Sequence, residues 1–360
     1  MKNSLTEARS SPVSSHNEWD PLEEVILGSL DFATVPPWHV TTASTMPREA
    51  WPLIQRQGGA QFPAELVDPA RRELDELGRL LEREQIKVRR PSTLDHARAF
   101  STPNWSSEGG LYAAMPRDSL IVVGNEIIEV PMAWRCRYHE TAAFRPLLKE
   151  YFQAGARWTS APKPQLLDEL YAVDGRHDEE PPHYAVTEAE PVFDAADFAR
   201  CGRDIFVQRS HVTNELGIEW MRRHLGPEYR VHVLEVNDSH PMHIDASFIP
   251  LAPGKVMINP ERVLSLPEMF STWEILEAPR PVKATLDGFS MCSTWISANT
   301  LMLDPERVLV EASEVPLIDA FRRWGFEPIP CTLKNFNRFG GGFHCATLDV
   351  RRRGDLQSYF

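Results

Sequence analysis

The sequence predicts a mixed α/β fold in which five similar units surround a pseudo-fivefold axis. Along the 360 residues, an apolar pattern with helical spacing precedes an apolar strand pattern five times. Each pair is followed by an irregular stretch and another apolar strand. This order of elements returns after about 45 to 75 residues, which is typical of a radial or solenoidal array. The helices exclude an all-β propeller, whereas an ordinary doubly wound sheet would give the same alternation and stays open.

The first part of the chain is the least regular. Residues 1–15 are polar and rich in Ser, so we expect a disordered tail before a single domain over residues 16–360. A short strand is predicted at 23–28. Residues 31–62 are rich in Pro, Thr and Gly, and predict a long irregular segment of the kind that covers a site or an interface.

Helix and strand patterns then alternate to the end of the chain. The predicted helix and strand pairs are 71–84 with 86–91, 144–154 with 156–162, 218–225 with 229–236, 267–273 with 274–280, and 315–324 with 326–333. The other predicted strands are 120–123 with 127–130, 204–208, 255–258, 301 with 308–310, and 343–350. The irregular stretches occupy the same place in every unit, so we expect them to meet at the centre.

The composition restricts the class of partner. A formal net charge of −13 argues against nucleic acid and anionic membranes, and suits a small cationic substrate. No window approaches the roughly 20 apolar residues of a membrane span, and the N-terminus lacks a signal pattern, so we expect a cytoplasmic protein. The five cysteines are odd in number and lack a CxxC spacing, which argues against a disulfide framework and a structural zinc site.

The glycine turn at 340–342 places Cys345 where a flexible turn meets the predicted buried strand. Glycine permits positive φ angles and a close approach of the backbone to a ligand. A thiol held at such a turn can be aimed at a bound small molecule, as a covalent nucleophile requires. The alternative is a buried structural cysteine.

Each predicted unit carries polar residues beside an apolar strand. They are Asp118 in the first, Asp194 in the second, His243 and Asp245 in the third, Cys292 and Ser293 in the fourth, and Cys345 in the fifth. A surface turn or cap would explain any one of these groups alone. Five groups that point to one centre favour a shared site.

These residue types suggest chemistry on a guanidinium group. His243 and Asp245 are two apart on a strand-like segment, so both side chains would leave the same face. Asp118, Asp194 and Asp245 would bind a planar cation through paired hydrogen bonds. Attack by Cys345 on its carbon, with His243 as the acid, would displace an amine and leave a covalent amidino-cysteine. A metal site is the competing use, but no HxH or HExxH spacing is present, and we expect no metal.

Four stretches of the chain resemble the L-arginine amidinotransferases. They are NEWD at 17–20, VGNEIIEVPMAWR at 123–135, NELGIEWMRRHL at 214–225 and GGGFHCATLDVRRRG at 340–354. That family includes glycine amidinotransferase, the inosamine-phosphate enzyme of streptomycin synthesis and a lysine-directed enzyme of phaseolotoxin synthesis. The resemblance implies a five-bladed α/β propeller, the pentein fold, and ping-pong transfer of an amidino group from L-arginine without a cofactor. It leaves a homodimer open.

The resemblance also assigns roles to individual residues. Cys345 looks like the family nucleophile, His243 like the general acid and base, and Asp194 like its orienting carboxylate. Asp118 and Asp245 resemble the pair that binds the guanidinium.

A second group of residues would hold the rest of the substrate. Arg262 resembles the residue that grips the donor carboxylate, assisted by Ser293 and its neighbour. That neighbour is Cys292 where glycine amidinotransferase has Ser, which puts its hydrogen-bonding role in doubt. His240 stands where the glycine enzyme has Asn, two residues before Met242. The streptomycin-pathway enzyme has small residues at the positions of His240 and Met242, whereas this chain has bulky residues at both.

We therefore expect an enzyme that uses L-arginine and an amino-acid acceptor, lysine or glycine, and releases L-ornithine. Met242 favours a small or slender acceptor over an aminocyclitol phosphate. The alternatives are a guanidine hydrolase of the arginine deiminase type, an amidinotransferase with an aminocyclitol acceptor, and a non-catalytic arginine-binding protein.

Overall fold

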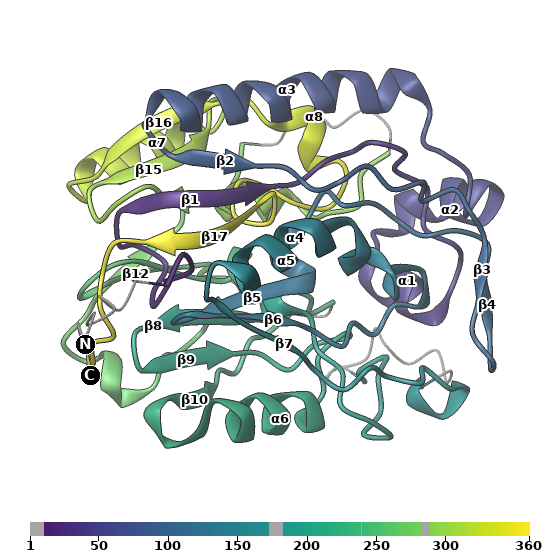
Figure 1. The fold of residues 1–360 in the computed structure, drawn as a ribbon. Coiled ribbons are helices and arrows are strands. Elements are labelled where there is room, and N and C mark those ends of the chain that lie inside the picture. Colours follow the sequence, from purple (N-terminus) through teal and green to yellow (C-terminus); the bar gives the residue numbers. More distant parts are fainter. Residues whose placement is uncertain (1–10, 173–182, 239, 283–288) are drawn as a thin grey trace, which may run out of the picture.

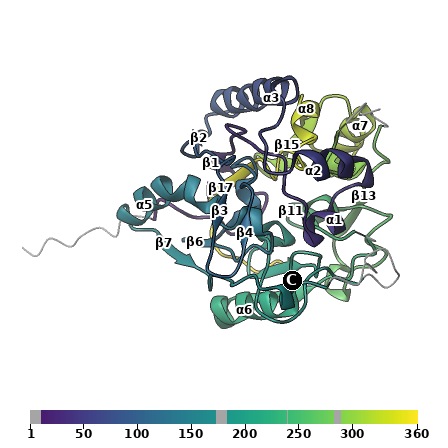
Figure 2. The same ribbon diagram turned by 90° about the vertical axis from the view of Figure 1, so that its right-hand side faces the viewer.

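The computed structural model describes residues 11–172, 183–238, 240–282 and 289–360. In these residues, five three-stranded sheets are arranged around a central axis (Figures 1 and 2), with the main helices on the outside. A separate two-stranded sheet, β3 (Phe100–Ser101) with β4 (Ser106–Ser107), lies at one edge of the molecule.

All five three-stranded sheets share one pairing pattern. The middle strand pairs antiparallel with one neighbour and parallel with the other. A parallel pair needs a crossover connection, and a helix or 3-10 turn supplies it in each unit. Each unit consists of an inner strand, a middle strand, the crossover element and an outer strand, in that order. The first two units are β17 (Thr347–Arg352), β1 (Leu22–Leu27), α3 (Ala64–Arg83) and β2 (Lys87–Arg89), and then β5 (Leu120–Val123), β6 (Glu126–Glu129), α5 (Arg145–Gln153) and β7 (Arg157–Ser160). The other three are β8 (Phe198–Cys201), β9 (Asp204–Val207), α6 (Glu215–Leu225) and β10 (Arg230–Val233); β11 (Phe248–Ala252), β12 (Lys255–Ile258), η8 (Glu268–Phe270) and β13 (Glu274–Glu277); and β14 (Leu301–Met302), β15 (Arg307–Glu311), α7 (Val315–Arg323) and β16 (Glu327–Cys331).

The last strand of the chain closes the ring. β17 pairs with β1, so that Thr347 lies opposite Leu27 and the two ends of the domain share one sheet (Figure 1). This arrangement confirms the predicted five-bladed α/β propeller. A doubly wound fold would instead place its strands in one continuous sheet.

Burial falls from the inner to the outer strand of each unit. The inner strands β5, β8 and β11 are buried throughout, and inner strands of neighbouring units contact each other. The outer strands β7 and β10 have exposed residues at both ends. The inner strands can be apolar on both faces because they pack against other units on each side. Among the described residues, no helix is both long and apolar enough to cross a membrane.

A buried ion network crosses the centre of the ring. Arg200 in β8 donates to Glu18 at 2.8 Å and to Asp349 in β17 at 2.7 Å, and Arg117 lies 2.6 Å from Asp349. Arg352 donates to the same carboxylate at 2.7 Å. Charges removed from water need such complete pairing, so this network fixes the inner strands relative to one another.

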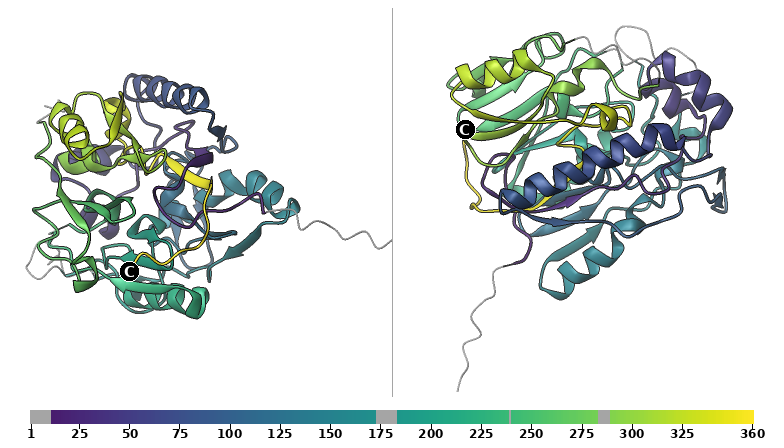
Figure 3. Two further views of the ribbon diagram at one scale, coloured as in Figure 1. Left: turned by 90° about the vertical axis from the view of Figure 1, so that its left-hand side faces the viewer. Right: turned by 90° about the horizontal axis from the view of Figure 1, so that it is seen from above.

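The structure corrects the predicted N-terminal boundary. Residues 1–10 lie outside the described residues, but Val13 is fully buried. The backbone N–H of Ser14 donates to Val350, and that of Ser15 donates to Gly124. The predicted tail is therefore wrong for residues 11–15, which Ser-rich composition alone made look disordered. Figure 3 shows the crossover helix α3 on the outside of the domain.

Three other predicted elements differ in detail. The segment 31–62 is not irregular, because it forms α1 (Val40–Thr45) and α2 (Trp51–Gln57) with a 3-10 turn between them. The helix predicted at 267–273 is only a 3-10 turn. The strand predicted at 343–350 begins at Thr347, so Cys345 lies in the turn before it.

Candidate active site

One cavity of about 590 Å³ gathers the predicted residues. All of them except Asp194 line it, together with residues 45–49 from the segment that carries α1 and α2. The prediction that this segment covers a site agrees with that position. The lining residues from the sequence prediction are Asp118, His240, Met242, His243, Asp245, Arg262, Cys292, Ser293 and Cys345.

The turn before β17 presents the Cys345 thiol. Gly340 has a φ of +96°, and a Cβ added at Gly341 would lie 2.4 Å from the sulfur of Met115, so this backbone requires glycine at both places. Asn299 holds the cysteine at two points: its Oδ1 accepts from the Cys345 N–H at 3.1 Å, and its Nδ2 lies 3.2 Å from Sγ. The thiol itself lies 3.3 Å from Oδ2 of Asp245.

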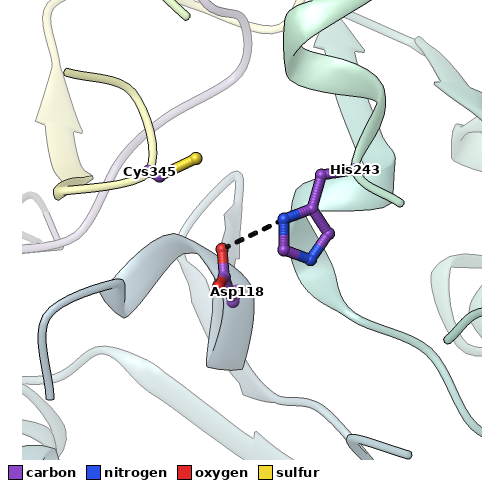
Figure 4. Close-up of side chains that lie close together, drawn as sticks. All are labelled: Asp118, His243 and Cys345. Atoms are coloured by element: carbon purple, nitrogen blue, oxygen red, sulfur yellow. Dashed lines mark ion pairs between the residues drawn. The ribbon is translucent and has the colours of Figure 1, made fainter. Parts of the chain in front are cut away.

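His243 faces the thiol from a turn rather than a strand. It has a φ of +62° and precedes a 3-10 turn over Ile244–Ala246 that contains Asp245. The prediction of an extended segment there is wrong, although both side chains do line the cavity. Figure 4 shows His243, Cys345 and Asp118 of α4 (Pro116–Ser119) reaching one space from three segments. Their nearest ligand atoms all lie within 4.8 Å of one another.

Two carboxylates flank the imidazole. Nε2 of His243 lies 3.0 Å from Asp194, and Nδ1 lies 3.7 Å from Asp118. Burial alone would lower the pKa of His243, but the charge of Asp118 and the hydrogen bond to Asp194 outweigh it, and the pKa rises well above its ordinary value. The ring is therefore protonated and can act as an acid.

The thiol is held in its protonated form by the same surroundings. Burial, and then the charge of Asp245, raise the pKa of Cys345 to about 12, although His243 acts in the opposite direction. For Asp245, burial acts to raise the pKa, but the hydrogen bond from His344 and the nearby positive charges lower it overall. The site thus combines an ionised carboxylate with a neutral thiol, and a cation placed between them would favour the thiolate.

Arg262 and Ser293 lie together in another part of the cavity. Nη2 of Arg262 lies 3.3 Å from the Ser293 hydroxyl, and Nε lies 3.0 Å from Asp238. Cys292 lines the cavity too, but its thiol donates to the carbonyl of Asn337 at 3.0 Å. Burial raises the pKa of Cys292 to about 11, so it is a neutral thiol with its hydrogen bond already used.

Several residues of the site were not predicted. Arg137 is buried and lies 2.9 Å from Asp118 and 3.8 Å from Asp194, which it links. Asn299 and His344 contact the nucleophile and its carboxylate neighbour. His344 directly precedes Cys345 in the sequence, and this position could have marked it as a residue of the site. Arg137 and Asn299 are brought in by the fold, and no local pattern marks them.

The side chains of Asp118, His243 and Cys345 form a group that could hold a metal ion, and in the described residues no other such group occurs. A thiolate, an imidazole and a carboxylate are ligands that suit zinc. Each of these side chains is also placed to act directly on a guanidinium, which requires no metal.

Comparisons with known proteins find amidinotransferases at high identity. No protein-family model matches the chain. It is 54% identical to the L-arginine:L-lysine amidinotransferase of Pseudomonas savastanoi pv. phaseolicola, over 100% of this chain and 99% of that one. It is 49% identical to the mitochondrial glycine amidinotransferase of Danio rerio, over 98% of this chain and 86% of that one.

Two solved structures are similar throughout. An amidinotransferase from Microseira wollei in the saxitoxin biosynthetic pathway superimposes with a TM-score of 0.91 and 51% identity, covering 97% of this chain and 100% of that one. The inosamine-phosphate amidinotransferase of Streptomyces griseus gives a TM-score of 0.89 and 38% identity, covering 97% of this chain and 99% of that one.

Proposed function

Because the chain belongs to the L-arginine amidinotransferase family, we propose that it moves the amidino group of L-arginine through Cys345 to an amino-acid acceptor, lysine or glycine. The first product is L-ornithine. The observation that carries this proposal is the single cavity in which a thiol, a protonated imidazole and two carboxylates meet. These groups are what covalent transfer of a guanidinium carbon needs.

The donor is held at both ends. Its guanidinium lies between Asp118 and Asp245, which accept charge-assisted hydrogen bonds from it. Its carboxylate binds Arg262 and Ser293, and Asp238 beside them is available to the α-ammonium group. This placement fixes the guanidinium carbon next to Cys345.

In the first half-reaction, the bound cation favours the thiolate, so the Cys345 thiol releases its proton to solvent and takes one back only after the final guanidinium product leaves. The Cys345 thiolate attacks the guanidinium carbon, and a C–S bond forms. His243 then protonates Nε of arginine, the nitrogen bonded to Cδ, as the bond between Nε and the guanidinium carbon breaks. Ornithine leaves with a neutral side-chain amine. The enzyme retains an amidinium group on sulfur, and the imidazole is left neutral.

In the second half-reaction, the acceptor enters the same cavity after ornithine leaves. Its amine attacks the amidinium carbon and gives a proton to His243. The C–S bond breaks with its electron pair on sulfur, which restores the thiolate. Donor and acceptor use the same groups in turn, so the acceptor should be an amino acid that Arg262 can also hold.

Two bulky residues that line the cavity support a slender acceptor. Met242 and His240 both line it, and their bulk suits a slender amine. The 54% identical relative is named as a lysine-directed enzyme, and the 49% identical one as a glycine-directed enzyme, which supports these two acceptors.

The test is to supply the purified enzyme with L-arginine alone and then with a panel of amines. We expect about one equivalent of ornithine, a covalent amidino adduct on the peptide that contains Cys345, and turnover only when lysine or glycine is added. The Cys345→Ala variant is the control and should form no adduct. Continuous release of citrulline from arginine alone would instead identify a hydrolase, and turnover confined to an aminocyclitol would refute the proposed acceptor.

A further inference from the structure

His344, the residue before the nucleophile, lies between two buried carboxylates. Its Nδ1 is 2.7 Å from Oδ2 of Asp245, and its Nε2 is 3.2 Å from Oε2 of Glu18. The ring is only 11% exposed. A ring that carries a proton on both nitrogens can donate to both acids, whereas a neutral ring can donate to only one.

One oxygen of Asp245 serves both neighbours. Oδ2 takes the hydrogen bond from His344 and also lies 3.3 Å from the Cys345 sulfur. The hydrogen bond from His344 therefore helps to fix the position of this oxygen relative to the Cys345 sulfur. The charge of His243 also lowers the pKa of this carboxylate, and the Cys345 thiol is a further titratable group in contact with it.

The second ring nitrogen of His344 contacts Glu18, which is itself held by arginine side chains. Glu18 accepts from Nε and Nη2 of Arg200 at 2.8 Å each, and Arg117 lies 3.5 Å from it. Nε of Arg117 also donates to the His344 carbonyl at 3.2 Å. These groups belong to the buried network around Asp349 that joins the inner strands, so Glu18 has no freedom to follow a moving ring.

From this geometry we propose that His344 is a positioning residue for amidino transfer: supported by Glu18, it keeps Asp245 ionised and turned toward the sulfur and the guanidinium. This inference rests on the proposed function, because it takes Asp245 to be a binding group for the donor. Nothing in it requires His344 to touch the substrate, since the ring acts only through the carboxylate.

Two observations favour this role over simple packing. Burial would raise the pKa of Asp245, and the hydrogen bond from His344 is the largest effect that lowers it. The imidazole, Glu18 and Asp245 also line one small cavity of about 20 Å³, where apolar residues such as Phe248 and Ile249 surround them, so the three polar groups depend on one another for partners. Without His344, an unsupported carboxylate in this place would take up a proton at a higher pH.

The test compares two amide substitutions that differ in where they place a donor. In His344→Asn the amide nitrogen can occupy the place of Nδ1 and donate to Asp245, whereas in His344→Gln it reaches the place of Nε2 and faces Glu18. We expect His344→Gln to raise KM for arginine by about tenfold to a hundredfold, as for loss of a charged hydrogen bond. We expect His344→Asn to raise it less.

The pH profile separates positioning from structure. In His344→Gln, the acidic limb of kcat/KM for arginine should move to higher pH, because Asp245 then loses its charge sooner as pH falls. His232→Asn is the matched control: its amide is too short to reach the place of Nε2, so it removes a similar contact, 2.7 Å between Nε2 and Asp204 in β9, away from the cavity. Its KM and pH profile should equal those of the wild type, and thermal unfolding checks that each variant is folded.

Three results would overturn the role of His344: an unchanged KM and pH profile in both variants, a fall in kcat at all pH values with KM unchanged, or His344→Gln retaining more affinity than His344→Asn. These results are separable from failure of the proposed function. If the wild-type enzyme formed neither ornithine nor a Cys345 adduct, the proposed function and this role would both be refuted. If the wild type were active and both His344 variants kept its KM and pH profile, this role alone would be refuted.

Discussion

Asp194 lies behind the imidazole of His243, 3.0 Å from Nε2, and takes no part in lining the cavity. The ring therefore has one nitrogen committed to a buried acid, while the other faces Asp118 and the thiol. A carboxylate in this position fixes the orientation of the ring and stabilises its proton. It is the arrangement that a group needs when it must give a proton in one half-reaction and take one in the next.

Replacing His243 by Asn should lower kcat by roughly 10² to 10⁴, because both half-reactions then lack their proton carrier. Asp194→Asn should have a smaller effect, since the imidazole remains but is less well oriented. Stopped assays of ornithine release and of product formation would measure the two steps separately. A loss below tenfold in His243→Asn would assign the proton transfer to another group.

Replacing Asp118 by Asn should mainly weaken arginine binding, with KM raised by about tenfold to a hundredfold, because half of a charge-assisted contact is lost. The same change removes the main charge that raises the pKa of His243, so the basic limb of the kcat profile should move to lower pH. Asp304→Asn is a suitable control, because Asp304 pairs with Arg307 at 2.7 Å outside the cavity. If KM stayed constant while kcat fell, Asp118 would not be a binding group.

Alkylation of Cys345 by iodoacetamide should become about tenfold faster for each pH unit above about pH 8 in the empty enzyme, because only the thiolate reacts. No plateau should appear below about pH 10, since burial and Asp245 hold the pKa of Cys345 near 12. The His243→Asn variant should react more slowly at each pH, because it lacks the charge that opposes this shift. Mass spectrometry of the peptide that contains Cys345 excludes the other thiols, and a plateau near neutral pH would contradict the expectation.

Exchanging His240 for Asn should alter the choice of acceptor. His240 lines the cavity two residues before Met242, so it can contact the second amine. A difference of one or two hydrogen bonds suggests a change of about 1 to 3 kcal/mol in the preference between glycine and longer amines, while ornithine release from arginine changes little. An unchanged ranking across the amine panel would move attention to residues 45–49, which also line the cavity.

The sequence by itself determined the order of the elements. Helix and strand periodicity depends on neighbours along the chain, so the crossover helices α5, α6 and α7 and the strands beside them could be predicted to within a few residues. The helix α3 begins at Ala64 rather than at residue 71, and the inner strands β8 and β11 were not predicted. The motif around Cys345 and its resemblance to a family likewise needed no coordinates. Composition misled where tertiary contacts decide the outcome, as for Val13, which is buried against the domain despite its polar surroundings in sequence.

Only the tertiary structure decided how the site is assembled. The inference that His243 and Asp245 share a face assumed an extended backbone, but His243 has a positive φ and Asp245 lies in a 3-10 turn. Arg137 and Asn299 come from distant parts of the chain and carry no local signature. They reach the centre because β17 pairs with β1 and closes five units into a ring. Closure depends on contacts between residues more than 300 positions apart, which a local sequence pattern cannot encode.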